Sequence, residues 1–97
     1  MTGWTYILEC SDGSFYVGST TDLAARVFQH DQGLGAAYTK ARLPVRLVWS
    51  AEFETVAEAF TFEKQVQRWG RAKRRALIER RMNDLPALAR KDFSRRQ

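Results

Sequence analysis

Two short runs of aromatic and β-branched residues, separated by four small or polar residues, constrain the fold of this chain most. The runs read TYILEC at residues 5–10 and FYVG at residues 15–18, with SDGS between them. Aromatic and β-branched residues favour strands, whereas Asp, Gly and Ser favour tight turns. The pattern therefore predicts an antiparallel β-hairpin at the start of the chain.

The length of the turn decides which side chains share a face of this hairpin. A two-residue turn would leave Tyr6 and Tyr16 on opposite faces. A three-residue loop would be a type I turn followed by Gly13 in the left-handed conformation, and it would pair Tyr6 with Gly18. Leu8 would then lie opposite Tyr16, and both tyrosines would lie on one face. The sequence permits either register.

A helix is expected directly after the hairpin. Asp22 is a suitable N-cap, and Leu23, Val27 and His30 follow at helical spacing on one stripe. The helix should end near residue 33, and residues 33–44 then form a loop long enough to suggest a functional surface.

The third strand and two further helices are predicted in the second half of the chain. Residues 45–53 alternate with period two, with Arg46, Val48, Ser50 and Glu52 facing away from Leu47, Trp49, Ala51 and Phe53. A capping box at Thr55 and Glu58 begins a helix. Its apolar positions are Ala59, Phe62, Val66 and Trp69, and Gly70 is placed to end it.

A second helix is expected at residues 71–81, with Leu77 and Ile78 facing the core. Asp84 would cap a last short helix before a basic tail at residues 90–97. The order strand, strand, helix, strand, helix, helix predicts a three-stranded antiparallel sheet packed by helices, an α+β domain.

Composition excludes several classes of protein. A chain of 97 residues has room for one core, and 44% hydrophobic residues argue against disorder. No segment resembles a membrane span or a signal peptide, so we expect a cytoplasmic protein with no membrane contact. Cys10 is the only cysteine and His30 the only histidine, which excludes an internal disulfide and a Cys/His zinc module. A bound metal is therefore expected to have mostly oxygen ligands.

The charge is distributed unevenly along the chain. Residues 1–62 carry four Lys/Arg against seven Asp/Glu, a net charge of −3, and residues 63–97 carry twelve against four, a net charge of +8. A one-sided basic region is typical of a nucleic-acid partner, although a solvated helical surface gives the same pattern.

The hairpin resembles the signature of the GIY-YIG nuclease superfamily. The signature stands here as WTY at residues 4–6 and YVG at residues 16–18, so both tyrosines and the final glycine match while the leading Gly-Ile does not. The pattern continues with Arg26, with His30 four residues later, and with Glu63 in a predicted helix after the third strand. The resemblance spans residues 4 to about 80. The chain looks most like the small stand-alone bacterial members, which are related to the catalytic module of excision-repair and homing endonucleases.

This resemblance implies a metal-dependent DNA endonuclease that hydrolyses phosphodiester bonds, directed at structured or single-stranded DNA in repair, recombination or processing. Residues 1–82 would form the catalytic domain, and residues 83–97 its basic C-terminal helix or tail. The implied active-site residues are Tyr6, Tyr16, Arg26, His30 and Glu63.

The implied roles follow the chemistry of each side chain. Glu63 would hold Mg²⁺ or Mn²⁺, because a hard cation takes one or two carboxylates and completes its shell with water and phosphate oxygens. Arg26 would neutralise charge on the phosphate through its planar guanidinium. Tyr6 would be the general base, with its pKa lowered by Arg26 and the metal, and Tyr16 would orient water or phosphate. His30 would orient or deprotonate a tyrosine, or protonate the leaving group.

Each of these residues also has an ordinary structural explanation when it is considered alone. Glu63 could pair with Lys64 or Gln67, and Arg26 could be a surface arginine. His30 could interact with the dipole at the end of its helix. The two tyrosines could be amphipathic strand residues.

Seven basic residues and one tyrosine are candidates for holding nucleic acid outside the catalytic centre. The tyrosine could stack on an unpaired base or anchor its own loop. The candidates are Tyr38, Lys40, Arg42, Arg46, Lys64, Arg68, Arg71 and Lys73.

Two other functions stay open on the sequence. The chain could be a catalytically silent nucleic-acid-binding module, or a protein-interaction domain with a solvated basic tail. No helix-turn-helix or zinc finger is recognisable, so recognition of a long DNA sequence is not expected. The sequence leaves open DNA against RNA, and the oligomeric state.

Overall fold

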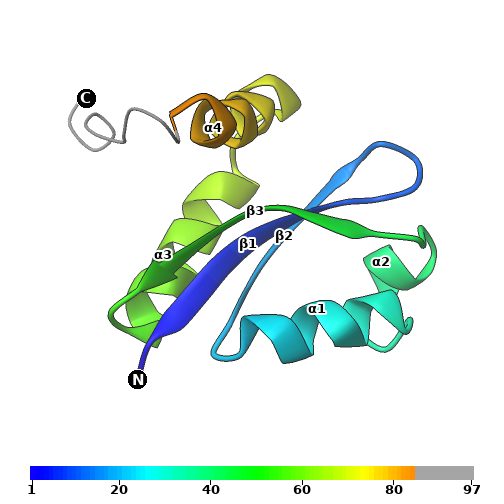
Figure 1. Ribbon diagram of the computed structural model, residues 1–97, viewed down its shortest axis with the longest axis horizontal. Helices are drawn as coiled ribbons and strands as arrows, with labels where there is room; N and C mark the ends of the chain where they lie inside the picture. Colours follow the sequence, from blue (N-terminus) through cyan, green and yellow to red (C-terminus); the bar gives the residue numbers. More distant parts are fainter. Residues whose placement is uncertain (85–97) are drawn as a thin grey trace.

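The computed structural model describes residues 1–84, and its elements confirm the predicted α+β class (Figure 1). They are β1 Gly3–Glu9, β2 Phe15–Thr20, α1 Leu23–Asp31, α2 Ala37–Lys40, β3 Arg46–Phe53, α3 Val56–Gln67 and α4 Arg71–Asp84. The expected last short helix and the basic tail at residues 90–97 lie outside the described residues. Within residues 1–84, no helix is long and apolar enough to cross a membrane.

The three strands form one antiparallel sheet in the order β2-β1-β3, with β1 in the centre. The hairpin has the three-residue loop, because Tyr6 lies opposite Gly18 and Leu8 lies opposite Tyr16. Gly13 has a φ of 84°, the left-handed conformation that this loop requires. Of the two registers that the sequence permits, the structure thus has the one that places both tyrosines on one face.

Strand β3 contains a bulge that the sequence analysis did not predict. Ile7 lies opposite Trp49, but the next residue, Leu8, lies opposite Leu47, so Val48 is the extra residue. The strict alternation predicted for residues 45–53 is wrong at this end. The bulge lets both Val48 and Trp49 pack on the same core, while Leu47 is left 39% exposed.

Helix α1 begins and ends where its capping residues predict. The Asp22 carboxylate accepts a hydrogen bond from the Ala25 amide at 3.1 Å. Leu23 and Val27 pack against the sheet, and His30 is fully buried in the last turn. The helix is followed by Gly33, whose amide donates to the His30 carbonyl at 3.0 Å.

The segment predicted as a loop at residues 33–44 contains the short helix α2. Side chains of this helix make hydrogen bonds both within its own segment and to a distant element. The Thr39 hydroxyl donates to the Ala36 carbonyl at 3.0 Å, and the Tyr38 hydroxyl donates to Ser14 in the hairpin loop at 2.7 Å. The second contact spans 24 residues, so a local sequence pattern could not predict it.

Helix α3 has the predicted capping box, but its C-terminal end differs from the prediction. It ends at Gln67, and Gly70 does not adopt the left-handed conformation of a glycine cap. The Arg74 guanidinium replaces that cap, because it donates to the Val66 and Gln67 carbonyls at 3.1 and 2.8 Å. Helix α4 begins as predicted and runs three residues past residue 81, the predicted end.

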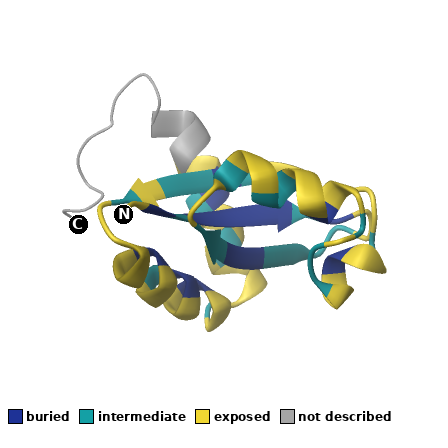
Figure 2. Ribbon diagram, turned by 90° about the horizontal axis from the view of Figure 1, so that it is seen from below, coloured by how far each residue is buried: buried dark blue, intermediate teal, exposed yellow. Residues whose placement is uncertain are grey.

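Different helices cover the two faces of the sheet (Figures 1 and 2). Helices α3 and α4 pack on one face around an apolar core of Ile7, Val17, Trp49, Val66 and Ile78. Leu77 packs against this core, as predicted together with Ile78. Helices α1 and α2 lie on the other face. The buried residues of that face are Tyr6, Leu8, Cys10, His30, Thr39 and Val45.

Candidate active site

A buried hydrogen bond between Tyr6 and His30 is the centre of the candidate site. The Tyr6 hydroxyl lies 2.9 Å from His30 Nε2, and the two residues are 1% and 0% exposed. Tyr6 comes from the central strand β1 and His30 from the last turn of α1. The tyrosine predicted as the general base and the one histidine of the sequence therefore form a buried pair.

Gly18 makes room for the Tyr6 side chain. A Cβ atom at residue 18 would lie 2.5 Å from the Tyr6 hydroxyl and 2.7 Å from the ring carbon that carries it. Such distances are too short for any side chain. The end of the Tyr6 ring thus packs on the backbone of β2 at the only residue of that strand without a side chain.

Tyr16 and Arg26 lie beside this pair. The Tyr16 ring is half-buried, with its centroid 5.1 Å from that of His30. Arg26 lies one turn before His30 on α1 and donates to Gln29 at 3.0 Å. Within the part of the chain that the structure describes, Arg26 belongs to no ion pair. Its positive charge is therefore available to an external anion.

Burial and Arg26 control the pKa values of the central pair. Burial raises the pKa of Tyr6 to about 12, although Arg26 acts in the opposite direction. Burial and the Arg26 charge lower the pKa of His30, so the imidazole is neutral at neutral pH. The expected lowering by Arg26 is present, but burial outweighs it. The further lowering of the Tyr6 pKa expected from a bound metal stays a prediction.

Glu63 reaches the same region from the opposite face of the sheet. Its carboxylate is 8% exposed, and each oxygen accepts one short hydrogen bond, from Ser19 at 2.6 Å and from Gln67 at 2.6 Å. Ser19 follows Gly18 on β2. The negative charge of Glu63 also raises the pKa of Tyr6, which indicates that the two groups are near each other.

Four of the five predicted catalytic residues, Tyr6, Tyr16, Arg26 and His30, thus lie on the α1 face, and Glu63 of α3 is close enough to act on the pKa of Tyr6. The partner suggested for Glu63 in the ordinary structural explanation, Gln67, is present as well. The other suggested partner, Lys64, instead lies over the Phe60 ring at 4.7 Å.

Glu63 is the residue that fits a metal ion. A carboxylate can accept about four hydrogen bonds or metal bonds. Two of these positions are occupied, so each oxygen retains capacity. In residues 1–84 no group of three His, Cys, Asp or Glu side chains is arranged to hold a metal. A site with one protein ligand suits Mg²⁺, which commonly keeps several waters.

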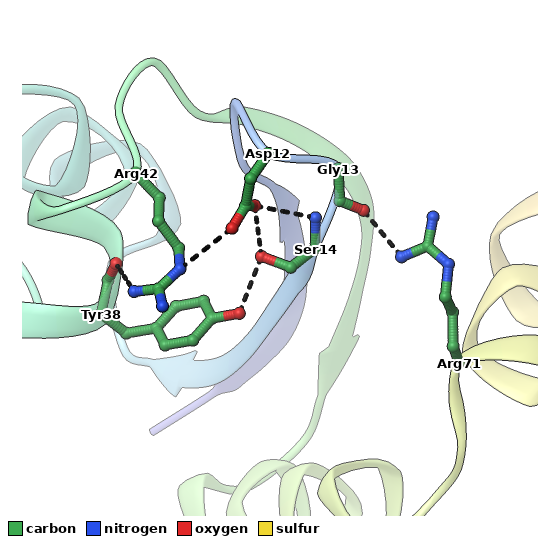
Figure 3. Close-up of polar contacts among 6 residues, drawn as sticks. All are labelled: Asp12, Gly13, Ser14, Tyr38, Arg42 and Arg71. Carbon is green, nitrogen blue, oxygen red and sulfur yellow. Dashed lines mark hydrogen bonds and ion pairs between the residues drawn. The ribbon is translucent and has the colours of Figure 1, made fainter.

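Tyr38 and Arg42 stabilise the hairpin loop (Figure 3). Arg42 donates to the Asp12 carboxylate at 3.1 Å and to the Tyr38 carbonyl at 3.0 Å, and its guanidinium lies 3.8 Å above the Tyr38 ring. Tyr38 donates to Ser14, which donates to Asp12 at 2.6 Å. The Tyr38 ring also stacks on Tyr16. Tyr38 therefore anchors its own loop, which was one of the two readings of this residue.

The other nucleic-acid candidates lie on several elements. Arg71 of α4 donates to the Gly13 carbonyl at 2.7 Å (Figure 3), and Arg46 pairs with Glu9 at 2.7 Å. Lys73 lies 4.5 Å above the Trp69 ring. Lys40 on α2 and Arg68 at the end of α3 are also exposed, and they make none of the contacts just named for the other candidates.

Sequence reasoning missed three residues that hold the catalytic candidates. Ser19 and Gln67 fix the Glu63 carboxylate, and Thr39 contacts His30 Nδ1 at 2.8 Å. Gln67 lies four residues after Glu63 on the helix, so the sequence indicated it only as an ordinary structural partner of Glu63 and not as part of the site. Nothing in the local sequence indicates Thr39, because its contact with His30 depends on how α2 folds back.

The fold agrees with a comparison to known protein families. The model of the GIY-YIG catalytic domain matches residues 2–76. This match covers more than half of the chain, and the chain belongs to the GIY-YIG family. Membership of this family implies an activity of the nuclease type.

Relatives of the chain come from bacteria. A UPF0213 protein from Staphylococcus aureus is 45% identical over 78 residues, which cover 80% of this chain and 95% of that protein. The solution NMR structure of the UPF0213 protein BH0048 from Bacillus halodurans is 43% identical, with a TM-score of 0.54, and the match covers 81% and 84% of the two chains. The protein EF2693 from E. faecalis is 31% identical, with a TM-score of 0.59 and coverage of 87% and 90%. These names state no activity.

Proposed function

We propose that this chain is a metal-dependent endonuclease that hydrolyses phosphodiester bonds in structured or single-stranded DNA, in repair, recombination or processing. The observation that carries the proposal is the buried Tyr6–His30 hydrogen bond, with Arg26 and Glu63 close enough to act on the pKa of Tyr6. Phosphodiester hydrolysis requires a base that deprotonates the attacking water, positive charge that neutralises the phosphate, and stabilisation of the leaving oxygen. We assign the catalytic unit to residues 1–82, with residues 83–97 as its basic extension, in a cytoplasmic protein.

Tyr6 and His30 act together as the base in this proposal. A tyrosine with a pKa of about 12 holds its proton at neutral pH, so it is a poor base by itself. His30 Nε2, 2.9 Å away, is the group that can take this proton. As a water molecule attacks phosphorus, its proton moves to the Tyr6 oxygen while the Tyr6 proton moves to His30. Tyr6 thus stays neutral throughout, and His30 becomes the imidazolium.

Arg26 and Tyr16 orient the reacting phosphate. The Arg26 guanidinium has no carboxylate partner in the described residues and can donate two parallel hydrogen bonds to phosphate oxygens. Tyr16 orients the attacking water or the phosphate from its half-buried position beside His30. A positive charge held in place before the reaction stabilises the additional negative charge of the transition state.

Glu63 is the proposed ligand of Mg²⁺ or Mn²⁺. When bound, such an ion supplies positive charge to a phosphate oxygen and to the leaving oxygen. Ser19 and Gln67 hold the carboxylate in one orientation, which keeps it directed at the β2 edge. We place the DNA backbone along exposed basic residues, with Lys40 and Arg68 as the most available of them.

The test is a nuclease assay on the purified full chain, with Mg²⁺ and Mn²⁺ against EDTA. The labelled substrates are single-stranded, flapped, branched and damaged DNA, and RNA. We expect metal-dependent cleavage of at least one DNA substrate. The Glu63→Ala variant should lose cleavage while folding and DNA binding are retained, and Glu52→Ala, at an exposed glutamate on β3, should cleave normally. Unchanged cleavage by Glu63→Ala would refute the mechanism.

A second candidate function is binding of nucleic acid without cleavage. The net charge of +8 on residues 63–97 favours binding in either case. The same assay separates the two functions, because a silent module binds nucleic acid in a salt-dependent way and leaves it intact. Absence of both cleavage and salt-dependent binding would instead indicate a protein-interaction domain.

A further inference from the structure

His30 is held by two residues of the segment that leads into and forms α2. Thr39 Oγ1 lies 2.8 Å from His30 Nδ1, and Thr39 is itself completely buried. Gly35 packs directly against the imidazole, since a Cβ atom there would overlap His30 Nδ1. With the Tyr6 contact at Nε2, both ring nitrogens have a partner inside the protein. The ring therefore cannot turn without breaking a buried hydrogen bond.

The hydrogen bonds of Thr39 indicate which ring nitrogen carries the proton. A threonine hydroxyl has one proton, and Thr39 donates it to the Ala36 carbonyl at 3.0 Å. The hydroxyl can then only accept at its second contact, so His30 Nδ1 is the donor. In a neutral imidazole the other nitrogen, Nε2, then has the lone pair, and the Tyr6 hydroxyl donates to it.

We propose that Thr39 is a positioning residue that fixes His30 in the Nδ1–H tautomer, with the Nε2 lone pair directed at Tyr6. This inference rests on the proposed function, because the lone pair is what allows His30 to take the Tyr6 proton. In the opposite tautomer His30 would donate to Tyr6 and could not accept its proton. The low pKa of His30, caused by burial and Arg26, agrees with a neutral ring.

The tautomer can be measured without any assay of activity. The chain contains one histidine, so a long-range ¹H–¹⁵N correlation spectrum of the full protein shows a single imidazole. We expect its two nitrogens to report the Nδ1–H form at neutral pH. A wild-type spectrum of the Nε2–H form would overturn the proposal. This result is independent of whether the protein cleaves DNA, so it separates failure of the inference from failure of the proposed function.

Three variants test the role of Thr39. Thr39→Val keeps the shape and removes the hydroxyl, and we expect it to shift the population toward Nε2–H. If the protein is a nuclease, this variant should also lower kcat by about tenfold or more, with little change in KM. Thr39→Ser should restore both readouts. Thr61→Val is the matched control, because Thr61 also donates to a helix carbonyl, at 2.9 Å, but contacts no histidine.

The outcomes are distinct. An unchanged tautomer in folded Thr39→Val would overturn the proposal, as would a tautomer shift of the same size in Thr61→Val. If Thr39→Val does not fold, the wild-type tautomer and the spectrum of Thr39→Ser decide, because Thr39→Ser must keep the Nδ1–H form.

Discussion

The residues buried on the two faces of the sheet differ in their chemistry. On the α3 and α4 face, the core cluster is apolar and includes Ile7, Val66 and Ile78, while the buried polar residues Thr5 and Glu63 lie outside this cluster. On the α1 and α2 face, the most deeply buried residues include Tyr6 and His30, joined by a hydrogen bond. Both faces share strand β1. One strand thus separates an apolar core from a buried polar cluster.

This difference suggests that one face mainly stabilises the fold and the other mainly positions residues. Burial of apolar surface stabilises a fold without requiring a particular geometry, so the α3 and α4 face can carry most of the stability. Buried polar groups contribute little net stability when paired and are costly when unpaired. The α1 and α2 face therefore fixes positions more than it stabilises the fold, which is what a catalytic site needs.

The largest expected effect on stability is at the apolar face. Ile7→Ala should lower the free energy of unfolding by about 2–5 kcal/mol, because it leaves a cavity in a core where Ile7 is fully buried. Urea denaturation measures this loss. Leu34→Ala, at a residue that is 75% exposed, is the control and should change stability by less than about 0.5 kcal/mol. Equal losses for the two variants would contradict the assignment of stability to this face.

The next effect is at the polar face. Tyr6→Phe removes only the hydroxyl and leaves buried His30 Nε2 without its donor, so it should cost about 1–3 kcal/mol. Tyr38→Phe is the matched control, since the Tyr38 hydroxyl makes its hydrogen bond at an exposed position. A smaller loss in Tyr6→Phe than in Tyr38→Phe would show that the buried pair is not the stabilising contact.

The same variant changes the dependence of stability on alkaline pH. The pKa of Tyr6 is about 12 in the folded protein, against an ordinary value of 10.0. Between these values the folded chain keeps a proton that the unfolded chain has lost, so the Tyr6 contribution is complete below pH 10 and lost as pH rises through about 12. The free energy of unfolding of the wild type should therefore fall more steeply with rising pH than that of Tyr6→Phe across this window, as denaturation at a series of pH values would measure. Parallel curves would refute the raised pKa.

The smallest expected effect is at the hairpin loop. Arg42→Ala removes the ion pair with Asp12 and the contacts with Tyr38, but the Arg42 and Asp12 side chains are 35% and 50% exposed. Solvent screens such pairs, so the loss of stability should be below that of Tyr6→Phe and should shrink at high salt. A larger loss than in Tyr6→Phe would mean that this loop, and not the Tyr6–His30 pair, holds the α2 segment in place.

The local parts of the fold were predictable from the sequence. The Asp22 cap and the capping box of α3 depend on residues a few positions apart, and so does the hairpin itself, although the sequence left its register open. The bulge at Val48 and the capping of α3 by Arg74 depend on contacts between distant elements. Periodicity and propensity contain no information about such contacts, which is why the end of α3 and the alternation of β3 were predicted wrongly.

The candidate site was also predictable only in part. The family pattern identified the residues that the structure brings together, but it could not predict their surroundings. The raised pKa of Tyr6 follows from the depth of burial, and the contact of Thr39 with His30 follows from the fold of α2. Arg42 and Tyr38 were identified by charge and ring chemistry alone, and their contacts within the hairpin loop depend on Asp12 and Ser14 across the chain.

Gly18 has a consequence for protein design. Because a Cβ atom there would fall 2.5 Å from the Tyr6 hydroxyl, a missing side chain determines how far the phenol extends. Transplanting the reactive residues onto another antiparallel sheet would therefore fail unless the neighbouring strand offered the same gap. A design of this site must specify a residue without a side chain as strictly as it specifies the acids, bases and cations.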